Sequence, residues 1–129
     1  QATSTNDQGI HKNTMTEQRQ YDLAERTATF AMNCRTFIHR LPKTISNIED
    51  SKQLARSSGS VAANYLEADE ALSKKDFALR IKICRKEARE SRLWLGLVSI
   101  NPEDEATRVA LAQEAYELVK ICNAIVAKS

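Results

Sequence analysis

Basic side chains are the residues of this chain whose type and spacing most clearly suggest chemistry. Residues 74–92 contain eight Lys or Arg against three Asp or Glu, although the formal net charge of the chain is only +2. With about 100° between successive residues of an α-helix, six of these cations fall within about one third of the circumference: Lys74, Lys75, Lys82, Arg85, Arg89 and Arg92. We call these six residues the basic arc. Because a concentrated basic face is typical of phosphate binding, the sequence predicts a nucleic-acid-binding surface there.

The neighbouring segments suggest a second interpretation of the basic arc. Residues 44–73 contain two Lys or Arg against five Asp or Glu, and residues 93–129 contain three against five. The acidic residues that could face the arc are Glu67, Asp69, Glu70, Glu103, Asp104, Glu105, Glu114 and Glu117. In this interpretation, salt bridges within one chain or between subunits neutralise the arc. The residues alone leave both interpretations open.

Catalytic and metal-binding patterns are absent from the sequence. It contains no Gly-rich phosphate loop, H-E-x-x-H motif or nucleophile elbow. A di-iron bundle needs Glu-x-x-His pairs on two helices, and no Glu-x-x-His occurs. The three cysteines, Cys34, Cys84 and Cys122, are odd in number and lack C-x-x-C spacing. We therefore expect buried thiols, no metal or other cofactor, and no enzymatic activity.

The elements that must position the basic arc are helices. Only three Gly and two Pro occur in 129 residues, and helix formers dominate. This composition favours a single all-α domain. Hydrophobic periodicity predicts helices over about 22–41, 47–72, 74–100 and 103–127, and the short turns between them favour an antiparallel up-down-up-down four-helix bundle. Residues 1–18 lack an apolar pattern, so we expect a disordered arm or an added extension before a natural start at Met15.

Residues suited to a core recur at spacings of three and four in each predicted helix. They are Leu23, Thr27, Phe30, Cys34, Phe37 and Leu41 in the first helix and Leu54, Ser58, Val61, Tyr65, Ala68 and Leu72 in the second. They continue as Phe77, Ile81, Cys84, Ala88, Ser91, Leu95 and Val98 in the third, and as Leu111, Ala115, Leu118, Cys122 and Ile125 in the fourth. The second set passes in phase through RSSGSVAANYLEADEA, residues 56–71, which resembles a linker. The preserved phase predicts one continuous helix, in which small residues such as Gly59 and Ala63 let a neighbouring helix approach.

Two further groups of residues carry predictions. The apolar residues Leu79, Ile83, Trp94 and Leu97 lie outside the core positions of the third helix, so we predict an oligomer interface there. Asn64 and Glu67 follow the small residues of the second helix and are predicted to face inward as structural polar groups. Glu67 would then pair with Arg85, Arg89 or Arg92. Ser46 or Asn47 is the predicted cap of the second helix.

The two central segments resemble a known family. LARSSGSVAANYLEADEA followed by KKDFALRIKICRKEARESRLWLGLV is similar to the four-helix-bundle family called 23S rRNA intervening-sequence proteins. The resemblance runs from about Tyr21 to Val126. It implies a bacterial, cytoplasmic, antiparallel four-helix bundle that forms a ring-shaped homopentamer. It also implies kinship with accessory proteins of diversity-generating retroelements, which form basic rings that engage a reverse transcriptase and RNA.

The expected function combines these observations. We expect a non-enzymatic homo-oligomer that binds RNA, or an RNA–protein complex such as a reverse transcriptase with its RNA, through the basic face of the third helix. The alternative is an adaptor or scaffold ring without nucleic-acid binding, whose basic arc makes subunit contacts. The longest apolar runs are far shorter than the roughly 18 residues of a membrane span, so no membrane partner is expected.

Overall fold

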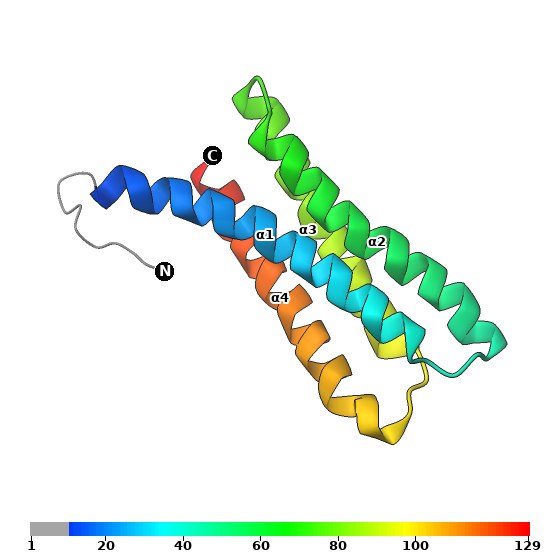
Figure 1. Ribbon diagram of the computed structural model, residues 1–129. Coiled ribbons are helices and arrows are strands. Elements are labelled where there is room, and N and C mark those ends of the chain that lie inside the picture. Colours follow the sequence, from blue (N-terminus) through cyan, green and yellow to red (C-terminus); the bar gives the residue numbers. More distant parts are fainter. Residues whose placement is uncertain (1–10) are drawn as a thin grey trace.

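Four α-helices make up the part of the chain that the structure describes, and no described residue lies in a β-strand. The structure is a computed structural model that describes residues 11–129, with side chains from Leu23 onward. The helices are α1 (His11–His39), α2 (Ile45–Asp69), α3 (Lys74–Leu97) and α4 (Glu105–Lys128), and the 3-10 helix η2 (Pro102–Asp104) leads into α4. The α1–α2 and α3–α4 turns lie at one end of the molecule and the α2–α3 turn lies at the other (Figure 1). The predicted all-α fold with four helices is confirmed.

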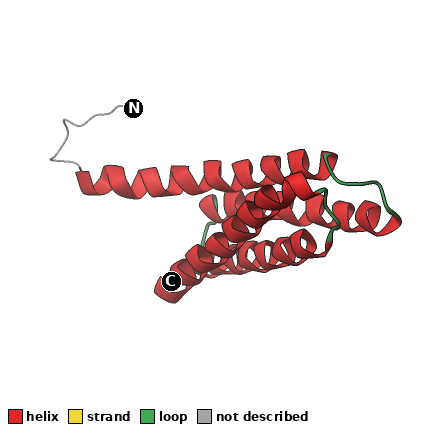
Figure 2. Cartoon of the chain, turned by 90° about the horizontal axis from the view of Figure 1, so that it is seen from below, coloured by secondary structure: helices red, strands yellow, loops and turns green. Residues whose placement is uncertain are grey.

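The first helix is longer than the sequence pattern predicts. α1 begins at His11 rather than near residue 22. Of the predicted disordered arm, residues 1–10 lie outside the described residues, and residues 11–18 are helical. No Gly or Pro occurs between His11 and Leu41, so no backbone signal interrupts the helix before the core pattern starts. The first turns of α1 project past the other helices (Figure 2).

The ends of α2 also differ from the prediction. Its N-cap is Thr44, whose side chain accepts a hydrogen bond from the backbone N of Asn47 at 3.1 Å, so neither Ser46 nor Asn47 is the cap. At the other end, Leu72 was predicted in the core but is 99% exposed. The helix ends at Asp69, and Leu72 therefore lies in the turn before Ser73, outside the helical phase that placed it in the core.

The hydrophobic core otherwise follows the predicted periodicity. Its buried members include Phe30, Cys34, Phe37, Leu41, Leu54, Val61, Tyr65, Ala68, Ile81, Cys84, Ala88, Leu95, Val98, Leu111, Ala115, Leu118 and Cys122. Leu23, Phe77 and Ile125 pack against it from partly buried positions. All three cysteines are buried and free, as predicted.

Small side chains form the centre of the α2–α3 interface, which is the most extensive helix–helix contact of the described chain. Ser57 and Ser91 are completely buried, and their Oγ atoms lie 2.8 Å apart. Ser91 Oγ can also donate to the backbone O of Glu87 at 2.9 Å, and Ser57 Oγ to that of Leu54 at 3.4 Å. Either hydroxyl can therefore be the donor between the two serines. The serines therefore bring the two helices together at a point where a larger side chain would not fit.

Gly59 faces α1 rather than α3. A Cβ atom at Gly59 would lie 3.1 Å from Nη2 of Arg35, whose guanidinium donates to the backbone O atoms of Ala31 and Ala55, at 3.1 Å each. Ala63 was predicted to accommodate a neighbouring helix but is exposed. Within the small-residue segment, Ser57 thus allows α3 to approach closely, and Gly59 leaves space for the Arg35 side chain. Ala63 has no such role within the chain.

A buried asparagine connects the two turns at one end of the bundle. Asn47 is 2% exposed, and its Nδ2 donates to the backbone O atoms of Pro42 at 2.8 Å and Ser99 at 2.9 Å. Its Oδ1 accepts from the backbone N of Ser99 at 2.9 Å. One buried amide side chain therefore satisfies backbone groups from both turns.

We predict that Ser57→Leu lowers the free energy of unfolding by about 1–3 kcal/mol, because the added atoms overpack the contact with Ser91. Urea unfolding monitored by circular dichroism measures the change. Ala63→Leu on the same helix is the matched control and should change stability by less than about 0.5 kcal/mol. Equal effects of the two substitutions would contradict the close approach at Ser57.

We also predict that Asn47→Ala costs about 2 kcal/mol of stability, because it removes the hydrogen bonds of a buried side chain to the backbone of both turns. The same urea experiment applies. Asn33→Ala, at an exposed position of α1, serves as the control with a change near zero. An Asn47→Ala protein as stable as the wild type would show that the side chain does not hold the turns.

Candidate nucleic-acid interface

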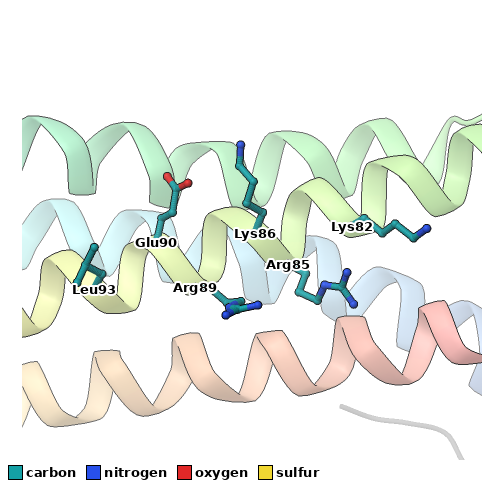
Figure 3. Close-up of a pocket in the computed structure, with 6 residues that line it drawn as sticks. All are labelled: Lys82, Arg85, Lys86, Arg89, Glu90 and Leu93. Carbon is teal, nitrogen blue, oxygen red and sulfur yellow. The ribbon is translucent and has the colours of Figure 1, made fainter.

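The basic arc lies along the solvent-facing side of α3. Five of its members are exposed, Lys74, Lys75, Lys82, Arg89 and Arg92, and Arg85 is half-buried. Arg85 and Arg89 are directed toward α4, whereas the nearby side chains of Lys86 and Glu90 are directed toward α2 (Figure 3). From Lys74 to Arg92 the arc extends for about 27 Å at 1.5 Å per residue.

No member of the basic arc forms an ion pair with any side chain that the structure describes. The two arginines that have partners contact neutral groups. Nη1 of Arg85 donates to Oδ1 of Asn123 at 2.8 Å, and the guanidinium of Arg92 lies 4.8 Å from the centroid of the Tyr116 ring. The arc therefore keeps its positive charge without a carboxylate within salt-bridge distance.

Four of the eight acidic residues that were predicted to neutralise the arc pair with other cations. Their ion pairs are Arg26–Glu114 at 2.7 Å, Arg40–Asp104 at 2.7 Å, Arg108–Glu105 at 2.6 Å and Lys120–Glu117 at 3.7 Å. The carboxylate of Glu114 also raises the pKa of Arg26 through a hydrogen bond. Neutralisation of the arc within one chain is thus not observed among the described side chains.

Two shallow hollows adjoin the central part of the arc. The first has a volume of about 400 Å³ and is lined by Lys82, Arg85, Lys86, Arg89, Glu90 and Leu93 (Figure 3). The second, of about 410 Å³, lies between α3 and α4 and is lined by Arg89, Arg92, Leu93, Tyr116 and Val119. Arg89 and Leu93 line both hollows, so the hollows adjoin each other, and we call the two together the central groove. Such a groove can hold the phosphates of an extended backbone.

The first two members of the arc stand apart from this groove. Lys74 lines a separate hollow at the α2–α3 turn, together with Leu72, Phe77 and Lys128. Lys75 is exposed in the same first turn of α3. The structure therefore divides the arc into a turn-proximal part and a central groove.

The predicted structural role of Glu67 is wrong within the chain. Glu67 is exposed, and among the described side chains it pairs with none of the arc arginines. A buried carboxylate between α2 and α3 does exist, but it belongs to Glu87, which is 6% exposed. Oε1 of Glu87 lies 3.3 Å from Nη2 of Arg56. In this pair the acid lies on α3 and the arginine on α2, whereas the prediction placed the acid on α2 and the arginine on α3.

Asn64 connects α2 to α3 from a half-buried position. Its Nδ2 donates to the backbone O of Ser60 at 2.9 Å, and its Oδ1 accepts from Nη1 of Arg80 at 3.3 Å. Arg56 also pairs with Glu90 at 3.2 Å. The polar residues of RSSGS and KEARES therefore hold the two helices together, and they are not arranged around a reactive group.

The predicted oligomer interface is only partly open to solvent. Leu79 and Leu97 are 52% and 57% exposed, whereas Ile83 and Trp94 are half-buried. Leu93, which the prediction omitted, is 53% exposed. At 100° per residue, Leu93 lies within about 40° of Leu79 and Leu97. The helical angles that defined the basic arc therefore also place Leu93 on the same face as Leu79 and Leu97.

The three thiols are buried, so reagents in solvent cannot reach them easily. Burial raises the pKa of the Cys34 thiol to about 12. The hydrogen bond between Cys84 and Cys122 raises the pKa of Cys84 and lowers the pKa of Cys122, but Cys122 is only 5% exposed. Among the described residues, no group of three or more His, Cys, Asp or Glu could hold a metal ion. None of the described helices has the length and apolar character that crossing a bilayer requires.

We predict that the three thiols react slowly with a disulfide reagent such as DTNB while the protein is folded, because all three are buried and inaccessible to the reagent. Absorbance at neutral pH measures the rate. All three thiols should react at once in guanidinium chloride, which is the control. Rapid reaction of one thiol in the folded protein would contradict the interpretation of these residues as core.

Comparisons with known proteins extend over all four helices. The family model for 23S rRNA-intervening sequence proteins matches residues 19–124. A similar solved structure is the crystal structure of a protein with unknown function from the S23 ribosomal protein family of Bacteroides thetaiotaomicron. It is 27% identical, with a TM-score of 0.73, and the match covers 84% of this chain and 97% of that chain. Among the curated proteins, none matches this sequence.

Proposed function

Because the chain belongs to the 23S rRNA-intervening sequence protein family, we propose that it is a non-enzymatic, homo-oligomeric RNA-binding protein of the cytoplasm. Its helices form an antiparallel up-down-up-down bundle, and its subunits form a ring-shaped homopentamer. The basic arc of α3 binds RNA or an RNA–protein complex.

The observation that carries the RNA-binding proposal is the unpaired charge of the basic arc. Six cations occupy one side of a single helix, and no described carboxylate lies within 4.0 Å of any of them. Their mutual repulsion destabilises the free protein, and a polyanion relieves it. Binding also releases counterions from the nucleic acid, which adds a favourable term at low salt.

The chemistry of the groove favours contacts with phosphates over contacts with bases. Proteins that bind unpaired bases usually offer free aromatic rings for stacking. Here the Tyr116 ring already contacts Arg92 and Lys120, at 4.8 Å and 5.1 Å from its centroid. Trp94 is half-buried. The arc therefore suits structured RNA, whose helices are recognised by shape and backbone.

The names of the relatives indicate which RNA to test first. The family model refers to 23S rRNA, and the similar solved structure comes from a family named after a ribosomal protein. A structured fragment of 23S rRNA is accordingly the first ligand to test.

The non-enzymatic part of the proposal is supported by the polar residues between α2 and α3. Arg56, Ser57, Glu87 and Ser91 each already make a contact that holds these two helices together.

We predict that Arg89→Glu with Arg92→Glu lowers the affinity for this RNA at least tenfold at about 50 mM salt, because two phosphate contacts are lost and two repulsions are added. Fluorescence anisotropy measures the affinity at several salt concentrations. The slope of log affinity against log salt should also become shallower by about 1–2.

The matched control is Lys43→Glu with Lys52→Glu, which makes the same change in net charge outside the arc at two exposed positions. It should weaken binding much less. An equal loss in the control would show that net charge, and not the arc, determines binding. Negligible affinity of the wild type at low salt would contradict the RNA-binding proposal.

A second function is favoured by the exposed leucines of α3. Leu79, Leu93 and Leu97 are each more than half exposed, and exposed apolar side chains on one face are typical of protein-binding surfaces. In this alternative the protein is an adaptor ring that does not bind nucleic acid. A stable oligomer with no RNA affinity at low salt would support it.

A further inference from the structure

Two surfaces of opposite charge have no partners within the described part of the chain. Eight acidic residues form ion pairs with neighbouring cations: Glu49, Asp76, Glu87, Glu90, Asp104, Glu105, Glu114 and Glu117. Glu67 and Glu70, near the end of α2, are exposed and are not among them. Lys74, Lys75 and Lys82 of α3 are likewise exposed and unpaired among the described side chains. Glu25, Asp50, Asp69 and Glu103 also lack an ion pair among the described side chains. Glu67, Glu70 and the three lysines are distinguished by their position on both sides of the α2–α3 turn.

Exposed leucines accompany both charged sets. Leu66 is 55% exposed and Leu72 is 99% exposed, on either side of the two acids. We call Leu66, Glu67, Glu70 and Leu72 the acidic end of α2. On α3, Leu79 is 52% exposed between Lys75 and Lys82. Each surface therefore offers apolar area for affinity and charge for orientation.

The two surfaces lie at the same end of the molecule. The acidic end of α2 immediately precedes Ser73, the cap of α3, and Lys74 and Lys75 belong to the first turn of α3. The α2–α3 turn that joins them forms this end (Figure 1). In a closed ring, each contact joins two different surfaces of neighbouring copies. The acidic end of α2 and the lysines of α3 are two different surfaces of opposite charge.

We propose that the acidic end of α2 docks on Lys74, Lys75, Leu79 and Lys82 of a second copy of this chain. Glu67 and Glu70 face the lysines of the neighbouring copy, and Leu66 and Leu72 cover Leu79. This inference rests on the self-association in the proposed function and names the surfaces that make it. It uses Lys82, at the edge of the central groove, and leaves Arg85, Arg89 and Arg92 free. These three arginines then bind RNA, while the three lysines hold the ring together.

Charge reversal and its rescue test this contact in the full-length chain. Analytical ultracentrifugation at about 100 mM salt measures assembly. Glu67→Lys with Glu70→Lys should raise the dissociation constant of the assembly at least tenfold, because like charges then face each other across the contact. Lys75→Glu with Lys82→Glu should have the same effect. All four substitutions in one chain restore opposite charges and should return the constant to within about threefold of the wild type.

The controls separate this contact from general effects of charge and from the RNA proposal. Lys43→Glu with Glu103→Lys exchanges two exposed charges outside both surfaces and should leave assembly unchanged. Circular dichroism confirms that each variant is folded. The Glu67→Lys, Glu70→Lys variant should retain its RNA affinity, because it removes no cation from the groove.

Two results would overturn the inference. In the first, both double variants assemble like the wild type, in which case the subunits associate through other surfaces and the proposed oligomer itself stands. In the second, the double variants dissociate but the fourfold variant stays folded and dissociated, so the two surfaces do not face each other. Loss of RNA binding without any change in assembly would contradict the proposed RNA binding and would not support the proposed contact between copies.

Discussion

The contact between α2 and α3 is the constraint on which the rest of the structure depends. At its centre two completely buried serines lie 2.8 Å apart. Beside them the buried carboxylate of Glu87 pairs with Arg56 of α2 and Lys86 of its own helix, at 3.3 Å and 3.8 Å. A buried charge without these partners would be strongly destabilising. The contact therefore fixes both the distance between the helices and the rotation of α3 about its own axis.

The rotation of α3 determines where its cations point. Ile81, Ala88 and Leu95 occupy the core, and Glu87 and Ser91 occupy the side toward α2. The basic arc consequently takes the side toward α4 and solvent, where Arg85 and Arg92 contact a neutral amide and an aromatic ring. The segments with the most specific resemblance to the family are thus the ones that orient the arc. The residues of α3 that contact α2 and the residues of the basic arc lie on one helix, so the contacts with α2 set the orientation of the arc.

Helical periodicity predicted most of the core because it is a local property of the sequence. Phe30, Val61 and Ala115 are buried where spacings of three and four place them, and only Leu72 is fully exposed, because α2 ends before it. Buried polar groups depend instead on partners far away in the sequence. Asn47 is buried against Ser99, and Glu87 against Arg56. No pattern within one helix distinguishes Glu87 from Glu67, so the prediction chose the wrong carboxylate. The positions of the arc residues on α3 follow from the sequence, whereas their lack of partners depends on how four helices pack.

The central claim is that a ring of these bundles holds RNA through cations that the fold leaves unpaired. The most direct test is the mass and absorbance spectrum of the purified protein in solution, measured before and after ribonuclease treatment. We predict an oligomer several times the 14.5 kDa chain mass that carries RNA at low salt, loses the RNA on nuclease treatment and remains an oligomer. A 14.5 kDa monomer that carries no RNA and binds none when it is added at low salt would contradict the claim.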